Sequence, residues 1–243
     1  MNYFVFNGVK SSDMGIKIIS KNVYSGPKAD VSSISIPGRN GELLNKNNRY
    51  GNVSLSYSCY LPAKSIQDLA DKTTRIKNWL FQDSGEYHEL YDDYDANFVR
   101  LASFSNNLDV SDQVRRIGIF TVSFTSLPER YEKDSLNLKE YDSKTAVVLN
   151  EYTLEAKPYF KIYGSGDITL IIQSEKENKI WYLKDVDEYI EIDSDEMNCF
   201  KDTASKNSTF SGDGFPTLKP GKNTITFEGN VTKFEMIERL VSL

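Results

Sequence analysis

Short runs in which apolar and polar side chains alternate recur along this chain, and they constrain its fold more than any other feature. The clearest run is Val53–Cys59, where serines separate Val53, Leu55, Tyr57 and Cys59. A period of two is typical of a strand that buries one face. Tyr and Phe are also plentiful, at 15 and 13 residues, which favours β structure. The sequence therefore predicts a mainly β protein.

One segment departs from this alternation. Between Ile66 and Leu80 the apolar positions recur at helical spacing. Ser65 followed by Asp68 is typical of an N-terminal cap, and Gly85 provides a stop signal after the segment. A single amphipathic helix among strands usually covers one face of a sheet. We therefore expect β strands with one helix in the first half of the chain.

Charge divides the chain into two parts. Residues 1–135 contain 16 Lys and Arg against 16 Asp and Glu, so the whole net charge of −6 falls on residues 136–243. Seven of the eight arginines precede residue 136, and only Arg239 follows it. This contrast predicts two domains, 1–135 and 136–243, with a boundary in the polar stretch Glu129–Lys157. The absence of a basic stripe argues against sequence-specific nucleic-acid binding.

Turn signals set the expected ends of the strands in both domains. The last strand of the first domain is predicted over Arg116–Thr125, and Pro128 is expected to end it. The second domain contains short apolar runs between Tyr159 and Ile237, at the spacing of a β-sandwich. No internal repeat is present.

The region between Val23 and Arg49 is rich in Gly, Pro, Asn and Ser. Its only apolar alternation involves Val31, Ile34 and Ile36. This pattern predicts one strand flanked by long loops.

A compact motif follows that strand, formed by Pro37, Gly38, Arg39, Asn40 and Gly41. Two glycines that bracket Arg39 fit a tight turn with positive φ, which glycine adopts without steric cost. Alone, the motif indicates a loop and no particular function.

His88 is the single histidine, and this excludes most arrangements for acid–base or nucleophilic catalysis. The run His88–Asp92 begins like a zinc-protease helix, but Asp92 stands where the second histidine is needed. No G-x-S-x-G sequence is present. We interpret His88 as a loop residue among tyrosines, and we expect no catalytic residue.

Two acidic clusters and one glycine turn resemble known kinds of site. Asp92, Asp93 and Asp95 resemble a glycosidase carboxylate pair, but adjacent carboxylates on such a segment are more often solvated. A second cluster lacks the spacing of a calcium loop; it contains Asp185, Asp187, Asp193 and Asp195. Pro220–Asn223 resembles the end of a phosphate loop only superficially. We therefore expect no metal and no cofactor.

The two cysteines, Cys59 and Cys199, lie far apart in the sequence, and we expect them to be reduced and packed. No stretch approaches the roughly 18 apolar residues of a membrane span. The segment Met1–Gly8 has no features of a signal peptide. We expect a protein made and kept in a cytoplasm, with no membrane partner.

Read together and in order, several segments resemble the siphophage distal tail protein family. These segments are Phe4–Gly8, Ile36–Gly41, Trp79–Leu80, Phe120–Pro128, Pro158–Gly164, Ile190–Asp193 and Phe215–Asn223. Each motif is short, but the ordered set spans nearly the whole chain.

The resemblance implies a structural component of the tail tip of a long-tailed phage or phage-tail-like particle. Residues 1–135 would form a tail-tube-like domain, six copies of which build a ring with a central channel. Residues 136–243 would form a galectin-like β-sandwich that projects outward. The implied partners are the other copies of the chain, the tail tube protein, the tail-associated hub protein, and a receptor-binding or side-fibre protein.

Two other functions stay open from the sequence. The second domain could bind carbohydrate, with Trp181 and Tyr182 as contacts, although alternation predicts that at least one of them lies in the core. A hydrolase of the host cell wall would need a catalytic set that the sequence does not supply.

Overall fold

The computed structural model describes residues 2–113 and 115–243. Within these residues the chain is mainly β, with one α-helix, as the sequence predicts. It divides into two compact units: residues 1–130 with Leu243, and residues 131–242. Each unit has its own cluster of buried apolar side chains. The roles of the two units, as a ring-forming and a galectin-like domain, stay predictions.

The first unit is built on an antiparallel sheet with strand order β2-β1-β7-β8-β10-β6-β3 and β9 beside β10. The strands are β1 (Phe4–Phe6), β2 (Val9–Lys10), β3 (Lys17–Lys21), β6 (Val53–Pro62), β7 (His88–Asp92), β8 (Phe98–Ser103), β9 (Ser111–Gln113) and β10 (Ile117–Glu132). The predicted alternation in β6 is confirmed, because Leu55, Tyr57 and Cys59 are fully buried. Their serine neighbours face the other side of the sheet.

Aromatic rings fill the centre of the first unit. The ring of Phe4 lies 4.5 Å from that of Tyr57 and 5.5 Å from that of Phe124. These three residues come from β1, β6 and β10, so packing of their side chains joins strands that are not all neighbours in the sheet.

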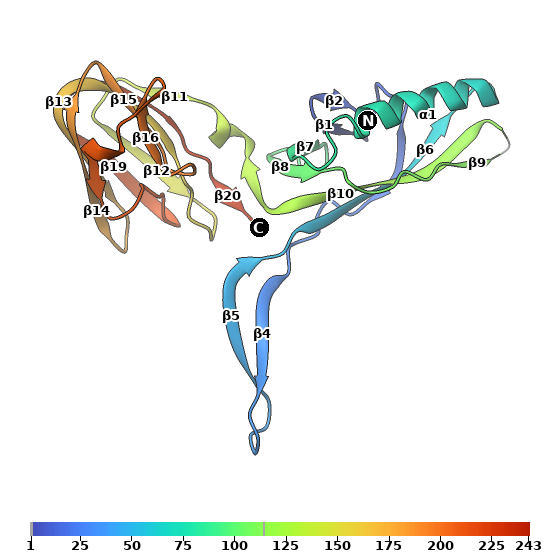
Figure 1. Cartoon of the computed structure of the whole chain (residues 1–243), viewed down its shortest axis with the longest axis horizontal. Helices are drawn as coiled ribbons and strands as arrows, with labels where there is room; N and C mark the ends of the chain where they lie inside the picture. Colours follow the sequence, from blue (N-terminus) through green and yellow to red (C-terminus); the bar gives the residue numbers. More distant parts are fainter. Residues whose placement is uncertain (1, 114) are drawn as a thin grey trace. The chain divides into compact units, whose positions relative to one another are not determined.

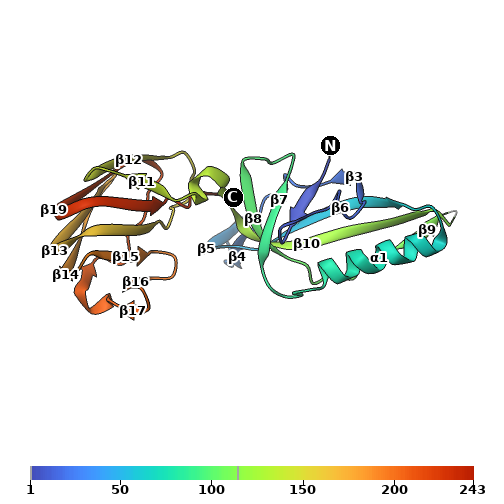
Figure 2. The same cartoon turned by 90° about the horizontal axis from the view of Figure 1, so that it is seen from above.

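The helix α1 spans Ile66–Leu80 and runs alongside the sheet (Figure 2). As predicted, Ser65 caps it: the Ser65 hydroxyl accepts a hydrogen bond from the Asp68 backbone N–H at 3.2 Å. Trp79 is buried, and its indole N–H donates to the Phe6 carbonyl at 3.1 Å. The helix ends at Leu80, five residues before the expected stop at Gly85. No helix of the described residues is long and apolar enough to cross a membrane.

The prediction of one strand with long loops between residues 23 and 49 is wrong. Strand β4 (Ala29–Ser35) pairs with a second strand, β5 (Glu42–Tyr50), to form a two-stranded sheet. This hairpin, here called the arm, projects away from the sheet of the first unit (Figure 1). Polar residues dominate β5 and it packs on no core, so it lacks the burial pattern from which strands are recognised.

The expected stop at Pro128 is also wrong, because β10 continues to Glu132. Its pairing with β6 ends at Ser126 opposite Val53, so the missing N–H of Pro128 removes no hydrogen bond to β6. The polar stretch that follows contains η1 (Lys133–Leu136), β11 (Lys139–Tyr141) and β12 (Thr145–Asn150).

The second unit has the strand order β11-β19-β13-β15-β16-β17, with β12 beside β19, and with β14 between β13 and β18. Its remaining elements are β13 (Tyr159–Gln173), β14 (Asn178–Val186), β15 (Tyr189–Asp193), β16 (Asn198–Lys201), β17 (Ala204–Ser205), η2 (Asn207–Thr209), β18 (Phe210–Gly212), β19 (Gly221–Ile237) and β20 (Val241–Ser242). The long strands β13 and β19 pair along most of their length and carry buried residues such as Phe160 and Phe234.

Candidate interaction sites

The arm is the most exposed part of the first unit. Every residue from 31 to 50 is exposed, including apolar side chains that would normally be buried. These apolar residues are Val31, Ile34, Ile36, Leu43, Leu44 and Tyr50. Leu44 has the largest exposed fraction among them, at 66%. Contiguous exposed apolar residues mark surfaces that bind a partner.

The tip of the arm contains the glycine motif. Gly38 and Gly41 have φ of 79° and 82°, in the region that favours glycine. The Arg39 N–H donates to the Ile36 carbonyl at 3.1 Å and closes the turn. A Cβ at either glycine would meet no other atom within 4 Å, so the backbone angle alone requires glycine. Pro37, Arg39 and Asn40 complete an exposed tip; their role in binding stays a prediction.

Polar contacts hold the two strands of the arm together near its base. Asp30 on β4 accepts hydrogen bonds from the Asn47 side chain at 2.9 Å and from Arg49, both on β5. These bonds lower the pKa of Asp30. The arm therefore has internal cross-strand contacts, although it has no core.

A buried ion cluster lies where the chain leaves β3 for the arm. The Lys21 ammonium lies 2.6 Å from carboxylate oxygens of both Asp92 and Asp93, and 3.5 Å from the centre of the Tyr94 ring. Burial raises the pKa of Asp92, and the hydrogen bonds from Lys21 and the Tyr94 N–H offset only part of this effect. The interpretation of Asp92 as solvated is wrong, because only 6% of it is exposed.

The first acidic cluster is thus held by cations and does not form an open carboxylate pair. Asp95 accepts a hydrogen bond from Arg130 at 2.9 Å, while Asp92 and Asp93 bind Lys21. His88 lies in β7 and not in a loop, because Glu89 and Leu90 continue its pairing with β8.

The second unit buries one of the two aromatic residues considered for carbohydrate binding. Trp181 is 1% exposed, and its indole N–H donates to the Gly214 carbonyl at 2.9 Å. The ring packs so closely on Gly212 that a Cβ there would lie 2.2 Å from Trp181 Cδ1. Tyr182 is exposed on the opposite face of β14. Only Tyr182 presents its ring at the surface.

The second acidic cluster is also divided among separate ion pairs. Arg239 donates to both oxygens of Asp193, at 2.6 and 2.8 Å. Lys157 pairs with Asp195 at 2.9 Å, and Lys201 pairs with Asp187 at 3.5 Å. Among the described residues, no group of three or more His, Cys, Asp or Glu is placed to hold a metal ion.

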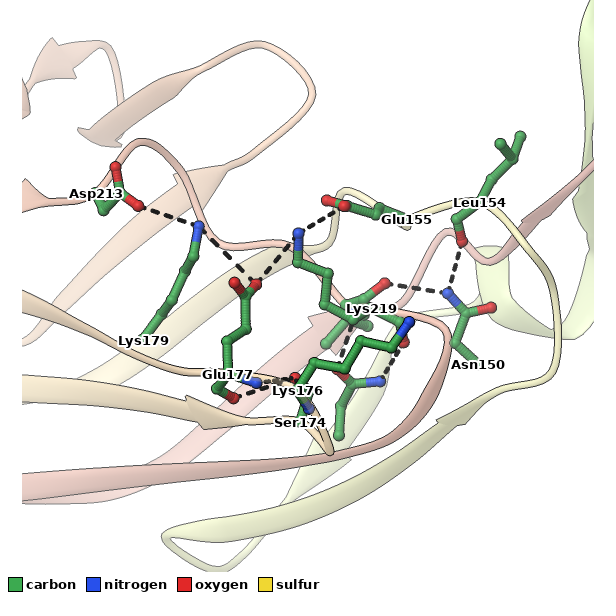
Figure 3. Close-up of polar contacts among 11 residues, drawn as sticks. Asn150, Leu154, Glu155, Ser174, Lys176, Glu177, Lys179, Asp213 and Lys219 are labelled. Carbon is green, nitrogen blue, oxygen red and sulfur yellow. Dashed lines mark hydrogen bonds and ion pairs between the residues drawn. The ribbon is translucent and has the colours of Figure 1, made fainter.

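A network of lysines and carboxylates covers one end of the second unit (Figure 3). Lys219 bridges Glu155 at 2.5 Å and Glu177 at 3.2 Å. Lys179 lies 3.2 Å from Asp213 and 4.0 Å from Glu177. These contacts connect β14 and the loops before β13 and β19, so the acidic unit neutralises part of its own charge locally.

The turn before β19 is organised by Asn223, which is fully buried. Its side-chain carbonyl accepts from the Lys219 N–H at 2.9 Å, and its amide donates to the Lys219 and Gly221 carbonyls. Gly221 has φ of 96°. The sequence Pro220–Asn223 therefore leads into the start of β19, where the Asn223 side chain holds the backbone of Lys219 and Gly221.

Both cysteines are free and buried, as predicted. Burial raises the pKa of each thiol, Cys59 and Cys199, to about 12. Neither thiol is poised to react.

Comparisons with known proteins agree with this architecture. Residues 9–126 match the family model of the phage tail protein RIFT-related domain. The crystal structure of the Dit protein (gp 19.1) of SPP1, described as a paradigm of the hub adsorption apparatus in phages that infect Gram-positive bacteria, superposes with a TM-score of 0.76 at 9% identity. The match covers 97% of this chain and 98% of that one.

A chain from the phage P2 baseplate in its activated conformation with calcium also matches, with a TM-score of 0.50 at 9% identity, over 97% of this chain and 96% of that one. No curated protein sequence matches. The fold is that of a phage hub protein, and the first unit carries a phage tail domain. Residues 9–126 belong to the family of the phage tail protein RIFT-related domain, and the chain as a whole has the fold of the SPP1 Dit protein.

Proposed function

We propose that six copies of this chain form a ring at the tip of a long-tailed phage or phage-tail-like particle. The first unit builds the ring around a central channel. The ring joins the tail tube protein on one side to the tail-associated hub protein on the other. The second unit, a galectin-like sandwich, faces outward and carries a receptor-binding or side-fibre protein.

The exposed arm is the observation that carries this proposal. A two-stranded hairpin is marginally stable on its own, and this one exposes six large apolar side chains without packing on the core of its unit. Contact with a neighbouring copy would bury them. In a closed ring every arm would contact the same surface of the next subunit, so the apolar side chains of all the arms would be buried.

Charge supports the same arrangement. Residues 1–135 are neutral overall and carry seven of the eight arginines, and Arg39 and Arg49 lie on the arm. Arginine is favoured at protein interfaces, and a neutral surface avoids repulsion between copies. The acidic half is better placed outside, where like-charged copies stand apart in solvent. We expect the arginines to point into subunit contacts, and the channel wall to be polar or acidic so that it does not hold DNA phosphates.

Native mass spectrometry at high protein concentration, together with electron microscopy of assembled particles, tests the ring. Six copies of 27.7 kDa give about 166 kDa. Leu44→Lys should abolish the hexamer and leave a folded monomer, because a charge replaces an apolar contact on the arm. Leu149→Lys is the control, since Leu149 is similarly exposed but lies in the second unit. A tail tip without sixfold symmetry, or a hexamer that persists in Leu44→Lys, would contradict the proposal.

Carbohydrate binding by the second unit is the alternative function. It would depend on Tyr182 and not on Trp181, because the Trp181 ring is enclosed. A glycan array probed with the full chain distinguishes the two functions. Binding that is lost in Tyr182→Ala would favour an adsorption protein, and no binding would favour a purely structural role.

We expect no hydrolytic or transferase activity. The carboxylates that most resemble a catalytic pair, Asp92 and Asp93, both bind the buried ammonium of Lys21. Turnover of peptidoglycan that is lost in Asp93→Asn would contradict this expectation.

A further inference from the structure

We propose that one ordered water molecule is bound inside the first unit, in a cavity between Tyr57, Asp92 and Arg100. The cavity has a volume of about 10 Å³, and Leu55 and Leu90 form part of its apolar wall. This volume is close to the smallest that holds a single water molecule, and a bound water needs two to four polar partners.

Three buried polar atoms of residues that line this cavity have no partner within hydrogen-bond distance among the described residues: Tyr57 Oη, Asp92 Oδ2 and Arg100 Nη1. Burial raises the pKa of Tyr57, and the nearby Asp92 carboxylate raises it further. Tyr57 is fully buried, and Asp92 and Arg100 are each 6% exposed. A buried polar group without a partner is costly, and three such groups around one cavity are rare in folded proteins. Their convergence indicates a shared ligand.

The hydrogen-bonding groups match a water molecule. Arg100 Nη1 can only donate, so the water oxygen accepts from it. Asp92 Oδ2 can only accept while it is ionised, so the water donates one hydrogen to it. The Tyr57 hydroxyl takes the remaining position, either as donor or as acceptor.

The balance of charge favours a neutral ligand over an ion. Three cations surround the site (Lys21, Arg100 and Arg130), as do three carboxylates (Asp92, Asp93 and Asp95). The Lys21 and Arg130 charges are already paired with carboxylates in direct contact. Because no net charge is left to compensate, neither a halide nor a metal cation is required.

The water would join strands that the sheet does not. Tyr57 lies on β6 and Asp92 on β7, and these strands are separated by β8 and β10 in the strand order. The bridge would lie beside Val23, in the segment that leads into the arm. It therefore adds a polar contact between strands of the first unit, near the segment that leads into the arm.

A crystal structure of the full chain at about 1.5 Å resolution, from crystals soaked in sodium bromide, is the direct test. We expect one water peak within hydrogen-bond distance of all three atoms, with no anomalous signal. An anomalous peak would identify a halide site and overturn the proposal. A direct Tyr57–Asp92 hydrogen bond that closes the cavity would overturn it as well.

Thermal unfolding of Val23→Ile provides a second test, which depends on the direction in which Tm changes. Val23 lines the cavity, and an added methyl group would displace the water and strip three polar atoms of their partner. Val53→Ile is the matched control, since Val53 is a similarly buried valine of the same unit that does not line the cavity. We expect Tm of Val23→Ile to fall about 4 °C below that of the control. Equal or higher Tm would indicate a dry cavity and overturn the proposal.

Discussion

Asp92 in the first unit and Asp193 in the second lie in similar positions, but their pKa values shift in opposite directions. Each is the last residue of its strand, each is more than nine-tenths buried, and each contacts a cation. Burial acts to raise both pKa values. It prevails at Asp92, whereas at Asp193 the hydrogen bonds from Arg239 and from backbone N–H groups outweigh it and lower the pKa.

The two aspartates differ in how many hydrogen bonds they accept and in which carboxylate oxygens accept them. Asp92 accepts from Lys21 and from the Tyr94 N–H on the same oxygen, and the like charge of Asp93 is close by. Asp193 accepts from Arg239 on both oxygens and from two backbone N–H groups. A planar guanidinium can donate to both oxygens of a carboxylate at once, whereas a lysine ammonium acts as a point charge. A nearby cation alone is therefore a poor measure of how well a buried charge is stabilised.

Removing the cation from the less satisfied site should have the largest effect. Lys21→Met leaves Asp92 and Asp93 without their shared partner, and we expect the free energy of unfolding at neutral pH to fall by about 3 kcal/mol. Urea unfolding measures this loss. Asp92→Asn in the Lys21→Met background should recover part of it.

Lys17→Met is the control for that experiment. Lys17 lies on the same strand, β3, and forms no ion pair among the described residues. Equal losses in Lys17→Met and Lys21→Met would show that the cluster contributes no more than the packing of a lysine side chain.

Asp193→Asn should have the next largest effect, a loss of about 2 kcal/mol at neutral pH, because hydrogen bonds to charged groups are stronger than neutral ones. Asp195→Asn is the control, since Asp195 forms an exposed pair with Lys157 and should change stability by less than about 1 kcal/mol. Similar losses in the two variants would contradict the assignment of Asp193 as the better stabilised charge.

The two aspartates should also produce opposite pH dependences in acid. The folded-state pKa of Asp193 is lowered, so its stabilisation is present above the unfolded value of about 3.9 and is lost as pH falls through the lower folded value. The folded-state pKa of Asp92 is raised. Ionisation of Asp92 therefore lowers stability as pH rises from the unfolded pKa to the higher folded pKa.

Urea unfolding between about pH 2 and pH 6 therefore separates the two sites. The Asp193→Asn variant should lose less stability on acidification than the unmodified chain, and Asp92→Asn should lose more. Parallel pH profiles for the two variants would contradict the opposite shifts.

The arm extends the comparison to a region that has no buried charge at all. Gly38→Val should lower stability by about 1 kcal/mol, because a branched side chain disfavours positive φ. Gly26→Val is the control, since Gly26 lacks positive φ and has open space around its Cα. Hydrogen exchange of the arm amides measures the effect locally. Equal protection in the two variants would mean that the turn places no demand on Gly38.

Local patterns allowed part of this fold to be predicted. The strand β6 and the helix α1 were predictable because their residues alternate or recur with the period of the element that buries them. The strand β5 was not, because it is polar and rests on no core. The bonds from the Asn223 side chain to the Lys219 backbone span only four residues and could have been inferred from the Pro-Gly sequence between them.

The ion clusters could not be predicted from the sequence. Lys21 contacts carboxylates 71 and 72 residues away, and Arg239 contacts one 46 residues away. Such pairs depend on how strands are ordered in a sheet, and one chain without relatives does not reveal this order. The family resemblance, in contrast, predicted the fold of the chain as a whole, because it depends on the order of many weak motifs and not on one local pattern.

The arm has a consequence for how the free protein behaves. Its apolar side chains remain in water until another molecule covers them, and its two outer edges offer unpaired backbone groups to any extended chain. The properties that make a subunit ready to assemble therefore also make it prone to aggregate. A substitution that makes the isolated chain more soluble by removing these side chains should weaken assembly in proportion. Solubility and the ability to assemble therefore cannot be improved independently on this segment.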